Sequence, residues 1–147
     1  MSEIGFYHLT RTGLAQVLPQ LLARTLAASQ RALVLCGTDD RVAALDRALW
    51  EGTEPWLPHG TPVDGDADLQ PIWLATDDAA PNDGKYLFLV DGTQTARLEA
   101  FDRVFDLFDG NDPTAVGAAR ERWRAAKADG HTLTYWQQGA RGWEKKA

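Results

Sequence analysis

Hydrophobic residues in this chain form two kinds of pattern, short continuous runs and segments with apolar positions every three or four residues. Continuous runs are typical of strands buried within a sheet, and the longer spacing is typical of one face of a helix. The runs predict strands over residues 4–9, 32–36, 71–75, 85–90 and 132–136. The helical spacing predicts helices over residues 14–29, 38–50, 95–108 and 113–129.

Turn and capping residues mark several ends of these segments. Thr38 or Asp39 can cap the second helix, where acidic side chains also favour the positive end of the helix dipole. Gly110 fits the end of the third helix. Pro19 falls inside the first helix, which predicts either a start near Leu18, with the proline in the first turn, or a kink.

Strands that alternate with helices predict right-handed crossovers and a mostly parallel sheet covered on both faces. The expected fold is a three-layer α/β/α sandwich, Rossmann-like in outline, in one domain over residues 1–147. A long loop over residues 51–69 contains three prolines and three glycines, and loops of this length are often functional. Residues 137–147 are expected to form a short C-terminal tail.

Composition and charge narrow the function classes. The 147 residues carry 15 Lys and Arg against 21 Asp and Glu, and the net charge of -6 opposes binding to duplex DNA. Cys36 is the single cysteine, so we expect no internal disulfide, no multi-cysteine zinc site and no cofactor. No apolar run approaches the ~20 residues that span a bilayer, and no basic-then-apolar leader opens the chain. We therefore expect a cytoplasmic protein without membrane contact.

Residue patterns for nucleotide binding and catalysis are weak. Gly37 stands alone after the second strand, where a dinucleotide site requires G-x-G-x-x-G, and no G-x-x-x-x-G-K-[ST] loop occurs. Neither serine lies in a G-x-S-x-G elbow, and His8, His59 and His131 lie far apart in the sequence. We therefore do not expect an enzyme. A nucleotide or small-molecule site near Gly37 remains as an alternative, by analogy with the fold alone.

One nine-residue segment around Trp123 holds four of the 15 basic residues. Arg120, Arg124 and Lys127 recur at helical spacing and form one stripe, about 100° from an apolar stripe that includes Trp123, while Arg122 points elsewhere. Two interpretations are open. Trp123 is either a half-buried core residue beside a solvated face, or an exposed ring beside cations that bind an acidic and apolar partner.

A second aromatic segment lies in the long loop. Trp56-Leu57-Pro58-His59-Gly60 is apolar where a surface loop is usually polar. Six tryptophans are a high count for this length, and tryptophan is enriched at the energetically dominant positions of interfaces. The segment either folds back onto its own core or presents a ring to a partner.

Short segments spread along nearly the whole chain carry a family resemblance. They are Phe6-Tyr7-His8-Leu9, Leu33-Val34-Leu35-Cys36, Leu45-Asp46-Arg47-Ala48-Leu49-Trp50, Trp56-Leu57-Pro58-His59-Gly60, Phe108-Asp109-Gly110, Ala119-Arg120-Glu121-Arg122-Trp123-Arg124 and Tyr135-Trp136-Gln137-Gln138. Their order and spacing together resemble the chi subunit of bacterial DNA polymerase III, an accessory protein of the clamp loader.

The resemblance implies an α/β domain that is related to nucleotide-binding folds but lacks nucleotide activity, and a non-catalytic role. Chi proteins bind the acidic, phenylalanine-ended C-terminal tail of single-stranded DNA-binding protein. They also bind the psi subunit, which connects them to the clamp loader. An interaction protein of the same fold with a different partner is a further alternative.

For individual cations, the resemblance implies that Arg120 binds the tail, with Trp123 as its neighbouring aromatic residue and Arg124 as the next basic residue. Arg120 can hold a carboxylate in a bidentate fork. Arg124 and Lys127 can attract further acidic residues of the tail at longer range. A contact of this kind is small, so the expected affinity is modest and sensitive to salt.

The resemblance also implies which aromatic residues take part. It assigns the loop aromatic before the Pro-His pair to Trp56, the tryptophan at the end of a helix to Trp50, and an apolar residue at the end of the preceding helix to Phe108. The expected site is one exposed notch in which Trp56, Phe108 and the face of Trp123 line a pocket beside the cations.

Overall fold

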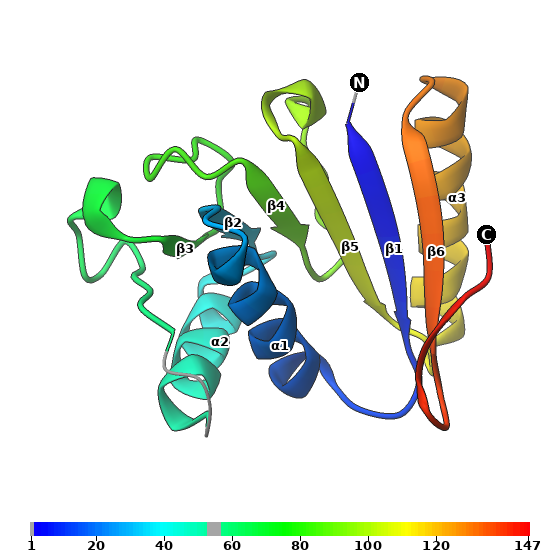
Figure 1. Ribbon diagram of the computed structural model, residues 1–147, viewed down its shortest axis with the longest axis horizontal. Helices are drawn as coiled ribbons and strands as arrows, with labels where there is room; N and C mark the ends of the chain where they lie inside the picture. Colours follow the sequence, from blue (N-terminus) through cyan, green and yellow to red (C-terminus); the bar gives the residue numbers. More distant parts are fainter. Residues whose placement is uncertain (1, 53–56) are drawn as a thin grey trace.

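The computed structural model describes residues 2–52 and 57–147. Within these residues the chain forms one seven-stranded sheet, three α-helices and two short 3-10 helices (Figure 1). The strands are β1 (Glu3–Leu9), β2 (Ala32–Leu35), β3 (Ile72–Ala75), β4 (Tyr86–Leu89), β5 (Arg103–Asp109), β6 (Thr132–Gly139) and β7 (Gly142–Lys145). The helices are α1 (Leu14–Ala27), α2 (Asp39–Glu51), α3 (Pro113–Ala128), η1 (Ala67–Leu69) and η2 (Leu98–Ala100).

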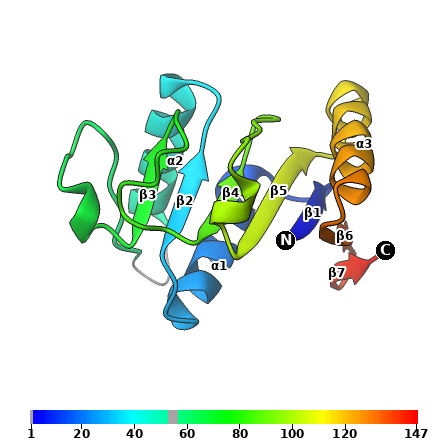
Figure 2. The same cartoon turned by 90° about the horizontal axis from the view of Figure 1, so that it is seen from above.

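The strand order is β3-β2-β4-β5-β1-β6-β7, and every pair is parallel except the final β6–β7 hairpin. Side chains alternate between the two faces of the sheet, so Tyr7 packs with α1 and α2 whereas Phe6 packs with α3. The two cores lie on opposite faces of the sheet, and Figure 2 shows α3 apart from α1 and α2. The predicted three-layer α/β sandwich with a mostly parallel sheet is confirmed.

The helix predicted over residues 95–108 is wrong. Only Leu98–Ala100 is helical, as one 3-10 turn, and Arg103–Asp109 forms β5 between β4 and β1. Phe101, Val104, Phe105 and Phe108 happen to recur at helical spacing, but all four are buried, Phe105 in the core with α1 and α2 and the other three in the core with α3. Asp106 interrupts the apolar run and thereby hides the pattern of a buried strand.

Gly110 does not end a helix, because it follows β5. Its N–H donates a 2.7 Å hydrogen bond to the carbonyl oxygen of Leu9 at the end of β1. A Cβ at this position would lie 2.8 Å from that oxygen and would overlap the ring of His8. The close approach of the ends of β1 and β5 therefore requires glycine.

The predicted helix boundaries hold in part. The α1 helix begins at Leu14 and contains Pro19 beyond its first turn, so a start near Leu18 is wrong. Thr38 caps α2, since its hydroxyl oxygen accepts a 3.1 Å hydrogen bond from the Arg41 N–H. Asp112 caps α3 in the same way, with proline in the first turn.

The two segments expected to be irregular are more ordered than predicted. Residues 142–145 of the predicted tail form β7, which pairs with β6 in an antiparallel hairpin. In the long loop, Gly60 forms an isolated parallel bridge with Trp73, and the η1 turn follows. Within the described ranges, no helix combines the length and the apolar character that crossing a membrane requires.

Candidate functional site

The α3 helix presents a basic face to solvent. Arg120, Arg124 and Lys127 are exposed, whereas Ala119 is buried and Trp123 is half-buried against the sheet. The predicted arrangement of two adjacent stripes is therefore confirmed. Arg124 pairs with Glu121 one turn earlier, but no carboxylate of the described residues lies within ion-pair distance of Arg120 or Lys127.

An aromatic cluster lies where α3 packs on β1, β5 and β6. The Trp123 ring stands edge-on to Phe6 at 5.3 Å and to Tyr135 at 5.8 Å between ring centroids. Phe108 lies 6.1 Å from Tyr135 and 5.1 Å from His8, again between centroids. These contacts hold Trp123 at the boundary between the core and the basic face, so both interpretations of this residue apply in part.

Tyr135 contributes to this surface and was not predicted as a site residue. Its hydroxyl lies 2.6 Å from Nδ1 of His8, and partial burial raises the pKa of the phenol while the charge of Arg120 opposes that rise. On α3, Arg120 is three positions before Trp123, whose ring stands edge-on to that of Tyr135. The alternation of apolar residues at 133 and 135 along the last predicted strand was a signal that could have placed Tyr135 under α3.

Arg122 differs from its basic neighbours, as the helical wheel predicted. Its guanidinium donates two hydrogen bonds to the Asp106 carboxylate, from Nε at 2.7 Å and from Nη2 at 2.9 Å. The side chains are only 10% and 3% exposed, and burial raises the pKa of Asp106 although Arg122 opposes the rise. Arg122 therefore holds α3 to β5 and is not part of the exposed basic face.

The structure brings together only part of the predicted notch. Phe108 is 4% exposed and forms the buried floor of the cluster, so it supports Trp123 rather than lining an open pocket. Trp50 is 58% exposed at the end of α2, where its ring lies 4.9 Å from that of His59. Because α2 and α3 cover opposite faces of the sheet, Trp50 does not join the basic face. Trp56 lies outside the described residues.

A cleft of about 690 Å³ lies at the carboxyl ends of β1 and β5. The chain leaves β1 into α1 on one face and leaves β5 into α3 on the other. Such a reversal is where open α/β sheets usually bind ligands. The alternative of a nucleotide or small-molecule site near Gly37 therefore depends on which polar groups are available at this edge.

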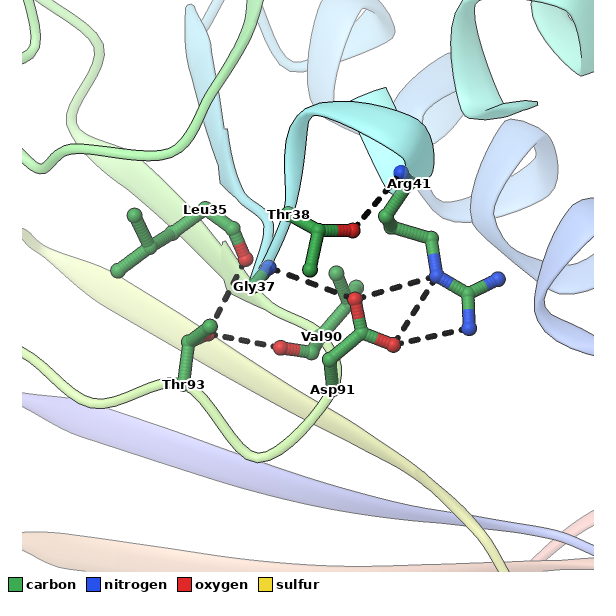
Figure 3. Close-up of polar contacts among 7 residues, drawn as sticks. All are labelled: Leu35, Gly37, Thr38, Arg41, Val90, Asp91 and Thr93. Carbon is green, nitrogen blue, oxygen red and sulfur yellow. Dashed lines mark hydrogen bonds and ion pairs between the residues drawn. The ribbon is translucent and has the colours of Figure 1, made fainter. Parts of the chain in front are cut away.

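At the Gly37 end of this edge, the chain's own acid occupies the start of α2 (Figure 3). The Asp91 carboxylate accepts a 3.4 Å hydrogen bond from the Gly37 N–H and forms a 2.9 Å ion pair with Arg41. The position where a helix N-terminus could hold a phosphate is therefore already neutralised by a carboxylate.

The turn between β1 and α1 is likewise occupied by one of the chain's own side chains. Three successive backbone N–H groups, of Thr10, Arg11 and Thr12, donate to the side-chain oxygen of Gln138 at 2.9, 2.8 and 3.1 Å. A dinucleotide site uses the corresponding turn for its pyrophosphate. Since internal side chains satisfy both places, the geometry offers no support for the nucleotide alternative.

Comparison with models of known protein families gives a match over most of this chain. The family is described as DNA polymerase III chi subunit, HolC, and its model matches residues 1–134. The matched range contains α3 and its basic face but ends one residue before Tyr135. Among curated proteins, no match to the chain was found.

Proposed function

The chain belongs to the DNA polymerase III chi subunit family, and we propose that it binds the acidic C-terminal tail of single-stranded DNA-binding protein through α3 and β6. Membership of the family makes it an accessory subunit of the DNA polymerase III complex with a role in DNA replication. The finer proposal is a non-catalytic adaptor that connects the tail to the clamp loader.

The observation that carries this proposal is the pair of unpartnered cations on α3 beside Trp123 and Tyr135. Among the described residues, Arg120 and Lys127 have no carboxylate within ion-pair distance, so they can pair with acids of another chain. Arg120 is three positions before the half-buried Trp123 on α3, so a guanidinium and an aromatic side chain are neighbours on the helix surface. A peptide that ends in phenylalanine offers the matching carboxylate and ring.

The distance between the two cations matches the length of a short extended peptide. Arg120 and Lys127 are seven positions apart on one helix, which corresponds to about 10 Å along its axis. An extended peptide covers that distance with about three residues. A terminal carboxylate held by Arg120 therefore places acidic residues about three positions upstream near Lys127.

A separate contact is proposed for the partner on the clamp-loader side. An adaptor must hold two partners at once, and Trp50 is an exposed tryptophan on the face opposite α3. We assign Trp50 to the interface with psi rather than to the tail site. A Trp50→Ala variant should then lose psi binding and keep tail binding. Weaker tail binding by this variant would instead show that Trp50 belongs to the tail site.

The test of the tail site is a calorimetric titration with a short acidic peptide that ends in Pro-Phe. Arg120→Glu should remove saturable binding, because it replaces the cation that faces the carboxylate. Arg47→Glu makes the same charge change at an exposed position of α2, on the opposite face, and should bind like the wild type. Equal binding by all three proteins rejects the site, and no binding by the wild type rejects the function.

A further inference from the structure

One end of the sheet, on the face that α1 and α2 cover, lies beyond these two helices in the described part of the chain. On the face that α1 and α2 cover, α1 packs on α2 and β5, and α2 packs on β3. Figures 1 and 2 show both helices over the β2 to β4 part of the sheet, while the end formed by β1, β6 and β7 lies beyond them. Strand alternation decides which side chains occupy this open part.

A row of five aromatic rings crosses this face from β4 to β7. Adjacent ring centroids lie 6.0 Å apart for Tyr86 and Phe105, 5.7 Å for Phe105 and Tyr7, and 6.5 Å for Tyr7 and Trp136. Trp143 stands perpendicular to Tyr7 at 5.2 Å. Tyr7 and Phe105 are largely buried within the row, whereas Tyr86, Trp136 and Trp143 are half-buried and keep surface open to solvent. We call these five rings the aromatic row.

Basic side chains accompany the aromatic row. The Arg103 guanidinium lies 4.9 Å from the Phe105 centroid and 5.6 Å from that of Tyr86. Lys145 is directly opposite Trp136 in the β6–β7 hairpin, so the two side chains share this face. In the part of the chain that the structure describes, no carboxylate forms an ion pair with Arg103 or Lys145.

The charges around Tyr7 show the same local excess of positive charge. Burial raises the pKa of Tyr7, Arg103 and Arg24 oppose the rise, and Glu3 adds to it. The charges that act on Tyr7 are therefore two cations and one acid, although the whole chain has a net charge of -6. The charges of Arg103 and Lys145, which form no ion pair among the described residues, favour an anionic ligand on this part of the surface.

We propose that the aromatic row binds single-stranded DNA, with bases stacked on Trp136, Trp143 and Tyr86 and phosphates near Arg103 and Lys145. Proteins that bind single strands combine aromatic rings with cations on an open sheet face. Protein interfaces also use tryptophan, so it is the cations without a described carboxylate partner beside the rings that favour a nucleic acid here. The exposed large hydrophobic residues among those described are Trp50, Val63 and Leu69, and none of them belongs to this face.

This site is independent of the proposed tail site. Trp143 and Lys145 lie beyond residue 134, where the family match ends, and outside the short segments that carry the family resemblance. The α3 site lies on the other face of the sheet. One molecule could therefore hold a DNA strand and the acidic tail at the same time.

The experiment uses the full chain and a fluorescein-labelled oligothymidine of about 20 nucleotides at about 50 mM salt, with anisotropy as the readout. The wild type should bind saturably, and duplex DNA of the same length should compete poorly. Trp136→Ala and Trp143→Ala should each weaken binding by about five- to 150-fold, the range expected for loss of one stacked base. Arg103→Ala should reduce the slope of log affinity against log salt concentration by about one, as expected for the loss of one phosphate contact.

Lys145→Glu keeps the test decisive if a tryptophan variant fails to fold, because Lys145 is exposed on an edge strand. It should weaken DNA binding and leave the tail-peptide titration unchanged, so failure of this proposal and failure of the tail site are distinguishable. Arg47→Glu, with the same charge change on α2, should bind DNA like the wild type. No saturable binding by the wild type, or equal loss in both charge variants, overturns the proposal. Loss of psi binding rather than DNA binding in Lys145→Glu also overturns it, in favour of a protein interface.

Discussion

Removing the guanidinium of Arg122 should destabilise the fold without acting through the exposed basic face. Arg122→Ala leaves the Asp106 carboxylate, which is 3% exposed, without the two hydrogen bonds of 2.7 and 2.9 Å that now satisfy it. Breaking a buried pair from one side costs about 3–5 kcal/mol. At about 3 °C per kcal/mol for a domain of this size, the melting temperature should fall by about 10–15 °C.

The loss of folding stability in Arg122→Ala should also depend on pH. Burial already raises the pKa of Asp106, and the loss of Arg122, which opposes that rise, raises it further. A carboxyl whose pKa is higher in the folded than in the unfolded state contributes stability at low pH, and this contribution is lost as pH rises through the folded-state value. The difference between Arg122→Ala and the wild type should therefore shrink when pH is lowered from about 8 to about 5.

Chemical unfolding followed by circular dichroism measures both effects. Arg120→Ala is the matched control, because Arg120 is on the same helix but exposed and free of a described carboxylate partner, and its effect should stay within about 0.5 kcal/mol. Replacing both members of the buried pair by apolar residues should recover much of the loss. Equal stability of the two single variants, or a deficit that grows at low pH, would refute the assignment of Arg122 to the core.

Two further predictions concern buried groups elsewhere in the fold. Burial, with a smaller effect of Asp91, raises the pKa of Cys36 to about 12, so at pH ~8 only about one thiol in 10⁴ is ionised. Native protein should react with a disulfide reagent far more slowly than unfolded protein, and equal rates would show that Cys36 is accessible. Gly110→Ala should destabilise the protein by more than about 3 kcal/mol in an unfolding titration, because its Cβ meets the Leu9 carbonyl at 2.8 Å. A change below about 1 kcal/mol would show that the ends of β1 and β5 can separate.

The strands with unbroken apolar runs were predictable because their burial on both faces leaves no other pattern. Residues 32–36 and 85–90 are of this kind, and β2 and β4 lie within them. The β5 strand was not predictable from local pattern, since a buried carboxylate in its centre is explained only by Arg122 on a distant helix. The β7 strand was missed because four residues beside a hairpin partner carry little periodic signal of their own.

The sequence predicted the candidate site only for residues that share a single helix. Helical spacing alone places Arg120, Trp123 and Lys127 together on α3. The separation of Trp50 from them depends on which face of the sheet each helix covers, and a single sequence does not specify that. Tyr135 was missed for a related reason, because its role arises from the parallel pairing of β6 with β1.

In the proposed complex, Arg120 holds the terminal carboxylate of an acidic tail beside Trp123 and Tyr135. Measuring the affinity of wild type and Arg120→Ala for the same Pro-Phe peptide, once with a free carboxylate and once with a C-terminal amide, isolates this contact. We expect the wild type to prefer the free acid by about 10- to 100-fold, as for a charge-assisted hydrogen bond, and Arg120→Ala to show no preference. The same preference in both proteins would mean that another group binds the carboxylate.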